Sequence, residues 1–353
     1  MVKRRQIGWL AALFFLRAAI SAWSGQAEEA LNEGLKLHEA GKPKEAVRQY
    51  DRALKANPKL AEAYFNRGNA HYDLGQNEQA VKDYSEVIRL TPKDAEAYYN
   101  RGNAYRRLKK DHLALKDYTT AIKLNPEDAK AYVNRGSIHF DARRYESAVE
   151  DHTEAIRLNP KDADHYYNRG NGLLALDKKE QAIEDYNQAI HLDPKLAEAY
   201  YNRGIAHADS DQNEKALEDF TKVLSLNPNS ADAFYNRGLA TAKLGKHEVA
   251  IEDYGEAIRL NPKDPEAPYN RGLAYLRVEK YDYAARDFSE AIRIQPRNAA
   301  VYVYRGISRL YQGKDKEAEA DFQKAYQMEP GLKKKLQPMV EEARAKIQQK
   351  AKE

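Results

Sequence analysis

The sequence predicts an all-α protein in which one helix hairpin recurs along most of the chain. A self-comparison at a shift of 34 residues aligns residues 27–332 without a gap. Within each 34-residue repeat, apolar and aromatic side chains follow helical spacing twice, on either side of a short polar turn. A proline closes every repeat and ends its second helix, because the residue before proline is biased out of the α region. Together these observations predict a solenoid of antiparallel helix hairpins.

The composition agrees with an elongated array better than with two compact globules. A length of 353 residues corresponds to about two domains, yet 32% of the residues are charged and the mean hydropathy is −0.85. Disorder is disfavoured because tyrosines and aliphatic residues recur in register. The chain has no cysteine, which excludes disulfides, thiol catalysis and cysteine zinc sites.

The net charge of +4 does not indicate a protein that binds polyanions. Residues 1–26 carry four basic and no acidic side chains, and therefore account for all of this charge. The repeats themselves hold slightly more acid than base. Since nucleic-acid-binding proteins show clustered Lys and Arg on a basic body, nucleic acid is not an expected partner.

The segment 1–26 is predicted to be a signal peptide, so that the protein is exported, into the periplasm if the cell is bacterial. A basic start precedes the apolar run 7–16, which would span only about 15 Å as a helix, half of a bilayer core. Gly25 and Ala27 then fit the −3 and −1 positions of a cleavage site. Two alternatives stay open: an uncleaved membrane anchor over residues 7–23, and a cytosolic protein.

Nine repeats fill residues 27–332, and three of their positions never change. The repeats span 27–60, 61–94, 95–128, 129–162, 163–196, 197–230, 231–264, 265–298 and 299–332. The eighth position is always glycine, the twentieth alanine and the thirty-second proline, as in Gly68, Gly102 and Gly170, Ala80 and Ala182, and Pro92. A helical glycine costs about 1 kcal/mol relative to alanine, so a compensating close contact between helices is expected. In the second repeat we predict this contact between Gly68 and Ala80.

Residues 333–353 are predicted to form a capping helix and a basic tail. From Lys334 to Lys350 the sequence places five apolar side chains on one helical face: Leu336, Met339, Val340, Ala343 and Ile347. Pro338 is compatible with this helix only near the first turn, where its missing N–H has no helical partner. The helix would cover the exposed side of the last hairpin, as the end of a solenoid requires.

The 34-residue period and its residues resemble the tetratricopeptide repeat (TPR) family. The fifth repeat shows the matching residues together: Tyr166, Gly170, Ala182, Tyr186, Ala189 and Pro194. The resemblance covers all of 27–332 and implies a right-handed superhelix of about one turn, with the first helix of each hairpin lining a concave groove. Three positions depart from the pattern. Pro268 in repeat eight and Ala30 in repeat one stand where repeat five has Tyr166, and His152 in repeat four stands where repeat five has Tyr186.

The resemblance implies that the sixth position of each repeat faces the concave surface, and here that position is a row of asparagines. The row consists of Asn32, Asn66, Asn100, Asn134, Asn168, Asn202, Asn236 and Asn270, and the ninth position adds Asn69, Asn103 and Asn171. A carboxamide offers an acceptor oxygen and two donors, so it can hold the N–H and C=O of a peptide unit without reading its side chain. The row therefore predicts a peptide-binding ladder, although a merely solvated row of asparagines stays open.

The fifth position adds a row of rings beside these amides. The rings are Phe65, Tyr99, Tyr167, Tyr201, Tyr235 and Tyr269. They would supply apolar contact area to a ligand at low entropy cost, and packing between repeats is the alternative. In repeats six to nine the ninth position is aliphatic, with Ile205, Leu239, Leu273 and Ile307. The groove is therefore expected to be polar at one end and more apolar at the other.

The second position is acidic in most repeats, and Lys130 is its only base. This pattern departs from the family members that clamp a C-terminal carboxylate, and it favours neutral or basic ligands. The seventh position is arginine and the twenty-third aspartate in repeats two to nine, as in Arg169 and Asp185. Repeat one lacks both residues, so we expect the arginine and the aspartate to pair, within a hairpin or with a neighbour.

The sequence contains no Walker loop, nucleophile elbow, zinc-protease motif or calcium loop, so an enzyme, a cofactor and a metal are not expected. His71, His139 and His207 occupy equivalent positions two repeats apart, too distant to share a metal. The sequence thus predicts a non-enzymatic protein–protein interaction module that binds an extended segment of a partner. The alternative is a structural scaffold for envelope complex assembly or polysaccharide export that docks partners on its convex face. Homo-oligomerisation is a third interpretation, and membrane contact is expected only through an uncleaved N-terminus.

Overall fold

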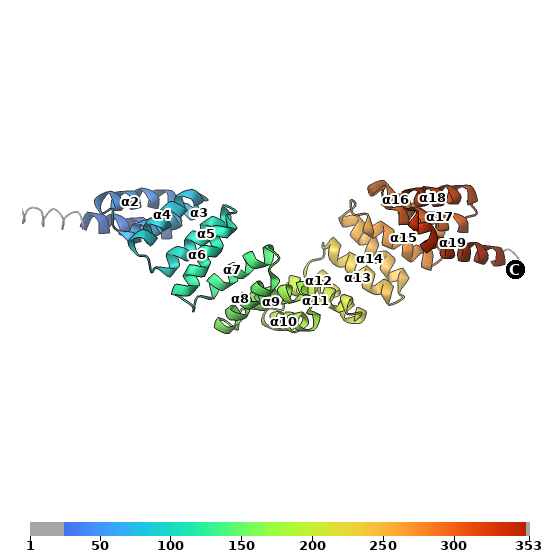
Figure 1. Ribbon diagram of the computed structural model, residues 1–353, viewed down its shortest axis with the longest axis horizontal. Coiled ribbons are helices and arrows are strands. Elements are labelled where there is room, and N and C mark those ends of the chain that lie inside the picture. Colours follow the sequence, from blue (N-terminus) through green and yellow to red (C-terminus); the bar gives the residue numbers. More distant parts are fainter. Residues whose placement is uncertain (1–24, 351–353) are drawn as a thin grey trace, which may run out of the picture. The chain divides into compact units, whose positions relative to one another are not determined.

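The computed structural model describes residues 25–350, and all regular secondary structure in that range is helical (Figure 1). The predicted signal peptide lies outside the described residues up to position 24. Gly25 and Ala27, the predicted cleavage-site residues, belong to the first described helix, residues 25–39, in which Ala27 is buried. None of the helices in the described range is long and apolar enough to span a bilayer.

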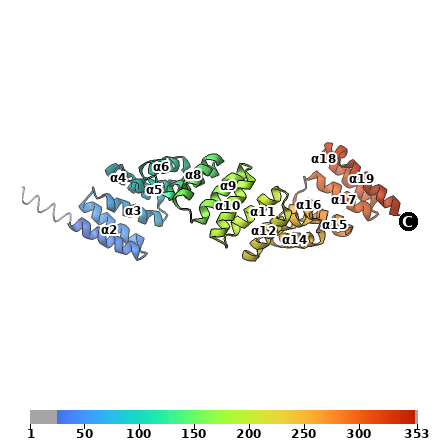
Figure 2. The same cartoon turned by 90° about the horizontal axis from the view of Figure 1, so that it is seen from below.

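The helices alternate as the first and second members of hairpins. After the helix 25–39 they are α2 (Pro43–Ala56), α3 (Ala61–Asp73), α4 (Asn77–Leu90), α5 (Ala95–Arg107), α6 (Asp111–Leu124), α7 (Ala129–Asp141), α8 (Tyr145–Leu158), α9 (Ala163–Ala175), α10 (Lys179–Leu192), α11 (Ala197–Asp209), α12 (Asn213–Leu226), α13 (Ala231–Lys243), α14 (His247–Leu260), α15 (Glu266–Arg277), α16 (Tyr281–Ile294), α17 (Ala299–Tyr311), α18 (Asp315–Met328) and α19 (Gly331–Lys350). Hairpin partners such as α5 and α6 lie side by side, and α4 packs on α5 between hairpins. Figure 2 shows the same pairs from below. The helices end before the prolines as predicted: α4 stops at Leu90, ahead of Pro92.

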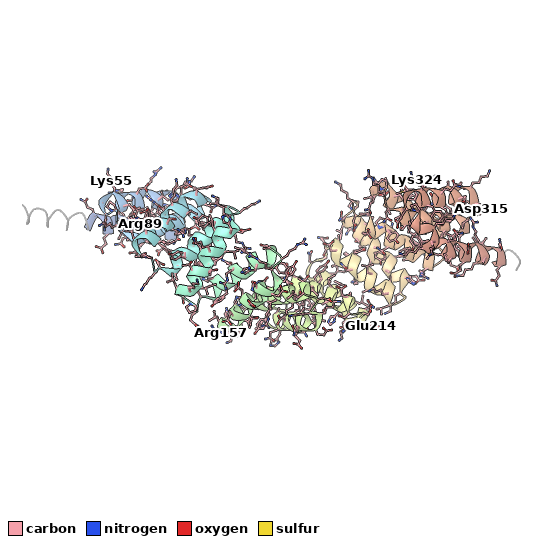
Figure 3. The ribbon with its side chains drawn as sticks, viewed as in Figure 1. Lys55, Arg89, Arg157, Glu214, Asp315 and Lys324 are labelled. Carbon is pink, nitrogen blue, oxygen red and sulfur yellow. The ribbon has the colours of Figure 1, made fainter. Side chains whose placement is uncertain are left out.

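The chain divides into two compact parts, residues 1–172 and 173–353. Both parts are built from the same hairpin, so that the packing of one hairpin describes the others. In each part, the second helices carry exposed charges that point away from the ribbon, such as Arg89 and Arg157 in the first part and Lys324 in the second (Figure 3).

The invariant glycine makes room for an aromatic ring. A Cβ atom on Gly68 would lie 2.8 Å from Cε1 of Tyr84, and one on Gly102 would lie 2.7 Å from Cε1 of Tyr118. Both rings are fully buried. The contact between Gly68 and Ala80 stays a prediction: Ala80 is buried, but the three atoms nearest to a Cβ on Gly68 all belong to the Tyr84 ring of the second helix. The ring buries far more apolar area than an alanine methyl, which offsets the helix propensity lost at glycine.

In seven hairpins the arginine at the seventh position binds the aspartate sixteen residues later in its own hairpin. Nε and Nη2 of Arg203 donate to Oδ2 and Oδ1 of Asp219 at 2.9 and 2.6 Å. Equivalent two-pronged pairs join Arg67 to Asp83, Arg101 to Asp117, Arg135 to Asp151, Arg237 to Asp253, Arg271 to Asp287, and Arg305 to Asp321. The predicted pairing is thus confirmed in these seven hairpins, and it lies within the hairpin. For Arg169 and Asp185 the pairing stays a prediction.

The same guanidinium also reaches the preceding hairpin. Nη1 of Arg203 donates to Oδ1 of Asn187 at 2.5 Å, and Nη1 of Arg101 donates to Oγ of Ser85 at 3.0 Å. In most repeats the guanidinium lies near a ring one turn earlier on its own helix, 5.4 Å from the centroid of Tyr200 in the case of Arg203. One arginine therefore connects three helices. We call this arrangement the arginine staple.

The C-terminal helix caps the last hairpin as predicted. Leu336, Val340 and Ala343 are buried in one cluster with Val303 of α17 and Phe322 of α18. Two details of the prediction are wrong. Met339 is 40% exposed because it turns away from this cluster. The helix also begins earlier, at Gly331, so Pro338 lies in its interior; there it removes one intrahelical hydrogen bond.

Two glycines test the ring contact. We expect Gly238→Ala to lower the free energy of unfolding by about 1–3 kcal/mol, because its Cβ would lie 2.8 Å from Cε1 of the buried Tyr254 ring. Gly255→Ala is the matched control, since its Cβ would meet only Nη1 of Arg271 at 3.5 Å. This control should raise stability by about 0.5–1 kcal/mol through helix propensity. Urea denaturation of both variants measures the effect, and equal stabilisation by both would contradict the ring contact.

A double-mutant cycle tests the staple. Asp219 is 4% exposed, so Arg203→Ala leaves a buried carboxylate without its partner, a change that destabilises proteins by about 3–5 kcal/mol. We expect a coupling energy between Arg203→Ala and Asp219→Ala above about 1 kcal/mol in urea denaturation. Strictly additive losses would show that the two side chains contribute independently.

Candidate functional site

The first helices of the N-terminal part line a small polar hollow of about 280 Å³. Its walls are His38, Asn69, Tyr72, Asp73, Tyr84, Asn100 and Asn103. Three of these residues belong to the predicted asparagine rows. The first-helix surface is therefore polar here, as the ninth-position asparagines predict.

The ninth-position asparagines are anchored by rings of the hairpin core. The hydroxyls of Tyr84 and Tyr118 donate to Oδ1 of Asn69 and Asn103, each at 2.7 Å. Burial raises the pKa of both phenols, so the hydroxyls keep the protons that they donate. Asn69 and Asn103 thus have a structural role as well as a place at the surface, which the sequence alone did not indicate.

The sixth-position asparagines pair with tyrosines of the preceding hairpin. Nδ2 of Asn236 donates to the hydroxyl oxygen of Tyr201 at 3.0 Å, and Nδ2 of Asn270 donates to that of Tyr235 at 3.0 Å. In the N-terminal part, Nδ2 of Asn134 donates to the hydroxyl of Tyr99 at 3.2 Å and to Oδ1 of Asn103 at 2.9 Å. The amide row and the ring row are therefore one network that crosses from hairpin to hairpin.

Asn236 and Asn270 use their amide nitrogens twice. Each Nδ2 also donates to the backbone carbonyl four residues earlier, at 2.9 Å for Asp232 and 3.0 Å for Glu266. Both N–H bonds are then engaged within the protein, so these two amides cannot hold both groups of a peptide unit, and the prediction is wrong for them. What remains for a ligand is the acceptor Oδ1 of the asparagine and the O–H of the paired tyrosine.

The tyrosine hydroxyls in this network are donors at physiological pH. Burial, with the charges of Glu266 and Asp264, raises the pKa of Tyr235 to about 12, and burial also raises the pKa of Tyr201. A phenol that accepts a bond from an amide and keeps its own proton can donate that proton outward. Each Asn–Tyr pair therefore combines one acceptor and one donor, contributed by two neighbouring hairpins.

Other members of the asparagine row have different surroundings. Nδ2 of Asn66 donates to the backbone oxygen of Glu62 at 2.9 Å. The fifth position of the preceding repeat, which supplies the tyrosine hydroxyl elsewhere, is Phe65 for Asn100 and Val133 for Asn168. The side chains of Asn100 and Asn168 make no hydrogen bond to any residue in the described range. The carboxamides of these two keep both donors and the acceptor, as the sequence predicts. Asn202, Asn171 and Tyr167 each have a partner within the chain.

The fifth-position rings pack into the hairpins while their edges remain at the surface. Phe65, Tyr99, Tyr201, Tyr235 and Tyr269 lie with centroids 5.8 to 6.1 Å from the buried ring of the same hairpin. All five are half-buried. Packing, the alternative to ligand contact, is thus confirmed for the ring faces. The hydroxyls of Tyr99, Tyr201 and Tyr235 still take part in the polar network.

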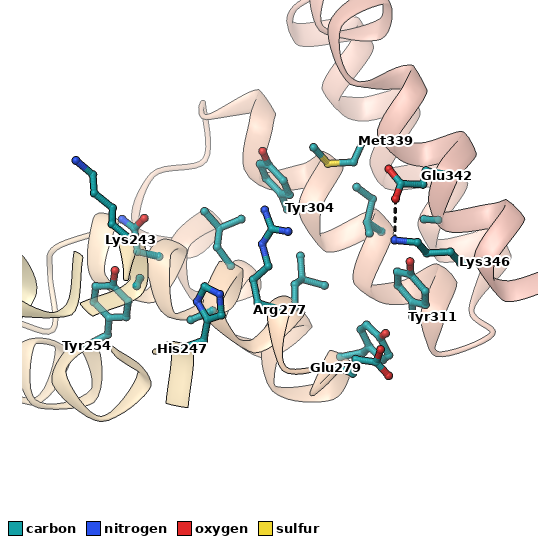
Figure 4. A pocket seen from close by; sticks show the side chains of 18 of the residues that line it. Lys243, His247, Tyr254, Arg277, Glu279, Tyr304, Tyr311, Met339, Glu342 and Lys346 are labelled. Atoms are coloured by element: carbon teal, nitrogen blue, oxygen red, sulfur yellow. Dashed lines mark ion pairs between the residues drawn. The ribbon is translucent and has the colours of Figure 1, made fainter. Parts of the chain in front are cut away.

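The first helices of the C-terminal part line a larger and more apolar pocket of about 900 Å³ (Figure 4). The aliphatic ninth-position residues Leu239, Leu273 and Ile307 all line it, together with Asn270 of the asparagine row. The prediction of a more apolar surface in these repeats is confirmed. The pocket has a wall that the repeat pattern did not predict, formed by α19.

The histidines at the eleventh position pack beside the arginine staple. Nε2 of His71 lies 3.9 Å from Oδ2 of Asp83, and Nε2 of His139 lies 3.9 Å from Oδ2 of Asp151. Across residues 25–350, no group of three His, Cys, Asp or Glu side chains is placed to hold a metal ion.

Comparisons with known proteins agree with this geometry. Family models described as TPR repeat or tetratricopeptide repeat match residues 34–75, 68–109, 95–128, 129–162, 170–211, 197–230, 240–278 and 269–332. No curated protein sequence matches the chain.

Three similar solved structures are TPR proteins. The C-terminal part of a TPR repeat-containing protein from Cytophaga hutchinsonii is 16% identical, covers 68% of this chain and 98% of its own, and has a TM-score of 0.59. A tetratricopeptide repeat protein from Parabacteroides merdae is 20% identical, with 71% and 99% covered and a TM-score of 0.51. YrrB, described as a TPR protein with an unusual peptide-binding site, is 26% identical, with 57% and 100% covered and a TM-score of 0.49.

The two structures with the higher TM-scores share the fold of this chain, and the family models match nearly all of its hairpins. With its arrays of packed helix hairpins, this chain belongs to the tetratricopeptide repeat family and is a protein–protein interaction module.

Proposed function

We propose that this protein binds an extended segment of a partner protein along the surface of its first helices. The observation that carries the proposal is the Asn–Tyr pair that joins neighbouring hairpins, as in Asn236 and Tyr201. An extended backbone offers N–H donors and C=O acceptors along its length. The free Oδ1 of the asparagine accepts from an N–H, and the O–H of the tyrosine donates to a C=O.

The pairs recur with the spacing of the hairpins, so one segment can meet several of them. Each neutral hydrogen bond contributes only about 0.5–1.5 kcal/mol net, and useful affinity therefore needs several pairs acting together. Asn100 and Asn168 fit the same ligand in a different way, because each keeps its donors and its acceptor. Such contacts bind the main chain of the ligand, and the pockets beside them determine which ligand side chains are accepted.

We also propose that the protein is exported and that the partner is a protein of the same compartment. The basic start and the apolar run of residues 7–16 support this location.

Removing the paired groups tests the binding mode. Peptides of roughly twelve residues, selected on the full chain from a random display library, serve as the probe. We expect Tyr99→Phe with Asn134→Ala, or Tyr201→Phe with Asn236→Ala, to weaken the selected peptides at least about tenfold, since two lost bonds of about 0.7 kcal/mol correspond to that factor. Fluorescence anisotropy measures the dissociation constants. Phe65 shows that a ring without a hydroxyl is accommodated at this position.

Charge reversal on the other face is the matched control. Arg89 and Arg157 lie on second helices and pair with Glu86 and Glu154 at exposed positions, so Arg89→Glu and Arg157→Glu should fold normally and leave the peptides bound. If these variants abolish binding while the Asn and Tyr variants keep it, the partner docks on the second helices and the proposal is wrong. That outcome would support a scaffold.

Tryptophan emission tests the export proposal. Trp9 and Trp23 are the only tryptophans of the chain, and both lie in the proposed signal peptide. We expect the mature protein purified from its host to show tyrosine emission alone. Indole emission from the mature protein, together with an intact mass that includes residues 1–26, would contradict cleavage.

A further inference from the structure

The pocket of about 900 Å³ in the C-terminal part combines parts of the solenoid with an added helix. Its floor comes from the first helices α13, α15 and α17, which supply Leu239, Leu273 and Ile307. Its outer wall is α19, which supplies Met339, Glu342 and Lys346 (Figure 4). A volume of about 900 Å³ lies within the range of pockets that hold ligands.

The α19 helix is a wall of this pocket and does not fill it. Its face with Leu336, Val340 and Ala343 is buried against α17 and α18. Met339, which has turned away from that cluster, is left 40% exposed on the pocket side. The pocket therefore stays open to a partner, with an apolar floor and one apolar side chain on its wall.

The charged side chains that line the pocket are Lys243, Arg277, Lys346, Glu279 and Glu342, and Glu279 has an interaction partner within the chain. Nζ of Lys346 lies 2.7 Å from Oε1 of Glu342, so these two side chains neutralise one another. Lys243 lies 3.8 Å from Asp211 and donates to the backbone oxygen of Ala208. Arg277 is exposed, and it has no ion pair or hydrogen bond to any described residue.

Arg277 is placed to receive a carboxylate. Figure 4 shows its guanidinium extending toward Tyr304, and the same pocket is lined by the apolar floor residues. The hydrogen bond to Lys346 and the charge of Lys346 lower the pKa of Glu342, and the charge of Arg277 adds a smaller contribution in the same direction. Beside an apolar surface, a guanidinium fork binds a carboxylate through two parallel hydrogen bonds.

We infer that this pocket binds an acidic segment of the partner whose aliphatic side chains enter the Leu239–Leu273–Ile307 floor and whose carboxylate binds Arg277. The inference rests on the proposed function and adds the side-chain chemistry of the ligand. It also amends the sequence-based expectation of a neutral or basic ligand, which came from the acidic second positions. Those positions lie at the start of the first helices, whereas Arg277 and Lys243 lie near their ends.

Peptide selection on the full chain tests the inference. Peptides of roughly twelve residues from a random display library should be enriched in aliphatic residues together with Asp or Glu. Arg277→Glu should weaken the enriched peptides at least about tenfold and should select Lys or Arg in place of the acids. Met339→Glu should weaken the same peptides, because it removes apolar contact and adds a like charge. Raising the salt concentration should weaken binding to the wild type more than to the Arg277→Glu variant.

Matched controls keep the charge change away from the pocket. Arg293→Glu reverses an exposed charge on α16, outside the pocket lining, and Gln348→Glu adds a charge to α19 away from it; both should bind within about twofold of the wild type. Circular dichroism of every variant confirms that it is folded.

The two proposals fail in different ways. Peptides without acidic enrichment, or an Arg277→Glu variant that binds them unchanged, would overturn this inference. If Tyr99→Phe with Asn134→Ala, in the other compact part, still weakens binding, the proposed function stands without it. If that variant and Tyr201→Phe with Asn236→Ala both bind normally while Arg277→Glu does not, the pocket is the site and the main-chain ladder is wrong.

Discussion

A buried aspartate held by an arginine sets the geometry of the first-helix surface. The guanidinium bonds Asp219 within its hairpin and Asn187 in the preceding one, so Arg203 fixes both the angle within a hairpin and the step to the next. Tyr201 and Asn202 directly precede this arginine on the same helix. A buried ion pair contributes little net stability, but separating it leaves an unpaired buried charge, so helix arrangements that break the pair are disfavoured. The 3.0 Å contact between Asn236 and Tyr201, on successive first helices, depends on that fixed step.

The repeats differ in how completely they build this staple. In repeat eight, Gly255 offers Arg271 no side-chain acceptor, and Pro268 stands one turn earlier, so that the ring near Arg271 is Tyr275, one turn later. In repeat nine, Asp321 has a second donor, because Arg309 also donates to it. The apolar pocket is lined by residues of repeats seven to nine and of α19. The extra helix itself packs on α17 and α18, the two helices of repeat nine.

The period and the helices could be predicted from the sequence because they depend on spacing alone. The contact of Gly68 could not, because helical spacing gives the face of a residue but not the rotation of one helix against another. That rotation places Tyr84, four residues beyond Ala80, over the glycine. The Asn–Tyr pairs could not be predicted either, because their members are 35 residues apart in the sequence and meet only through the packing of one hairpin on the next. A signal was nevertheless present: tyrosine at the fifth position of repeats three, five, six and seven precedes asparagine at the sixth position of the next repeat, whereas Leu31, Phe65 and Val133 stand at the fifth position of the other repeats that precede an asparagine.

The use of the amide nitrogens changes what this surface can recognise. A free carboxamide turns to suit either a donor or an acceptor, and it loses that freedom when a ligand binds. The nitrogen of Asn270 is already held by Tyr235 and by the Glu266 carbonyl, so its oxygen is fixed before any partner arrives. Fixing a group in advance lowers the entropy lost on binding. In Asn236 and Asn270, the internal bonds that engage both N–H groups therefore leave an acceptor of defined direction. Specificity for side chains then depends on the two hollows, which are polar around Asn100 and apolar around Leu273.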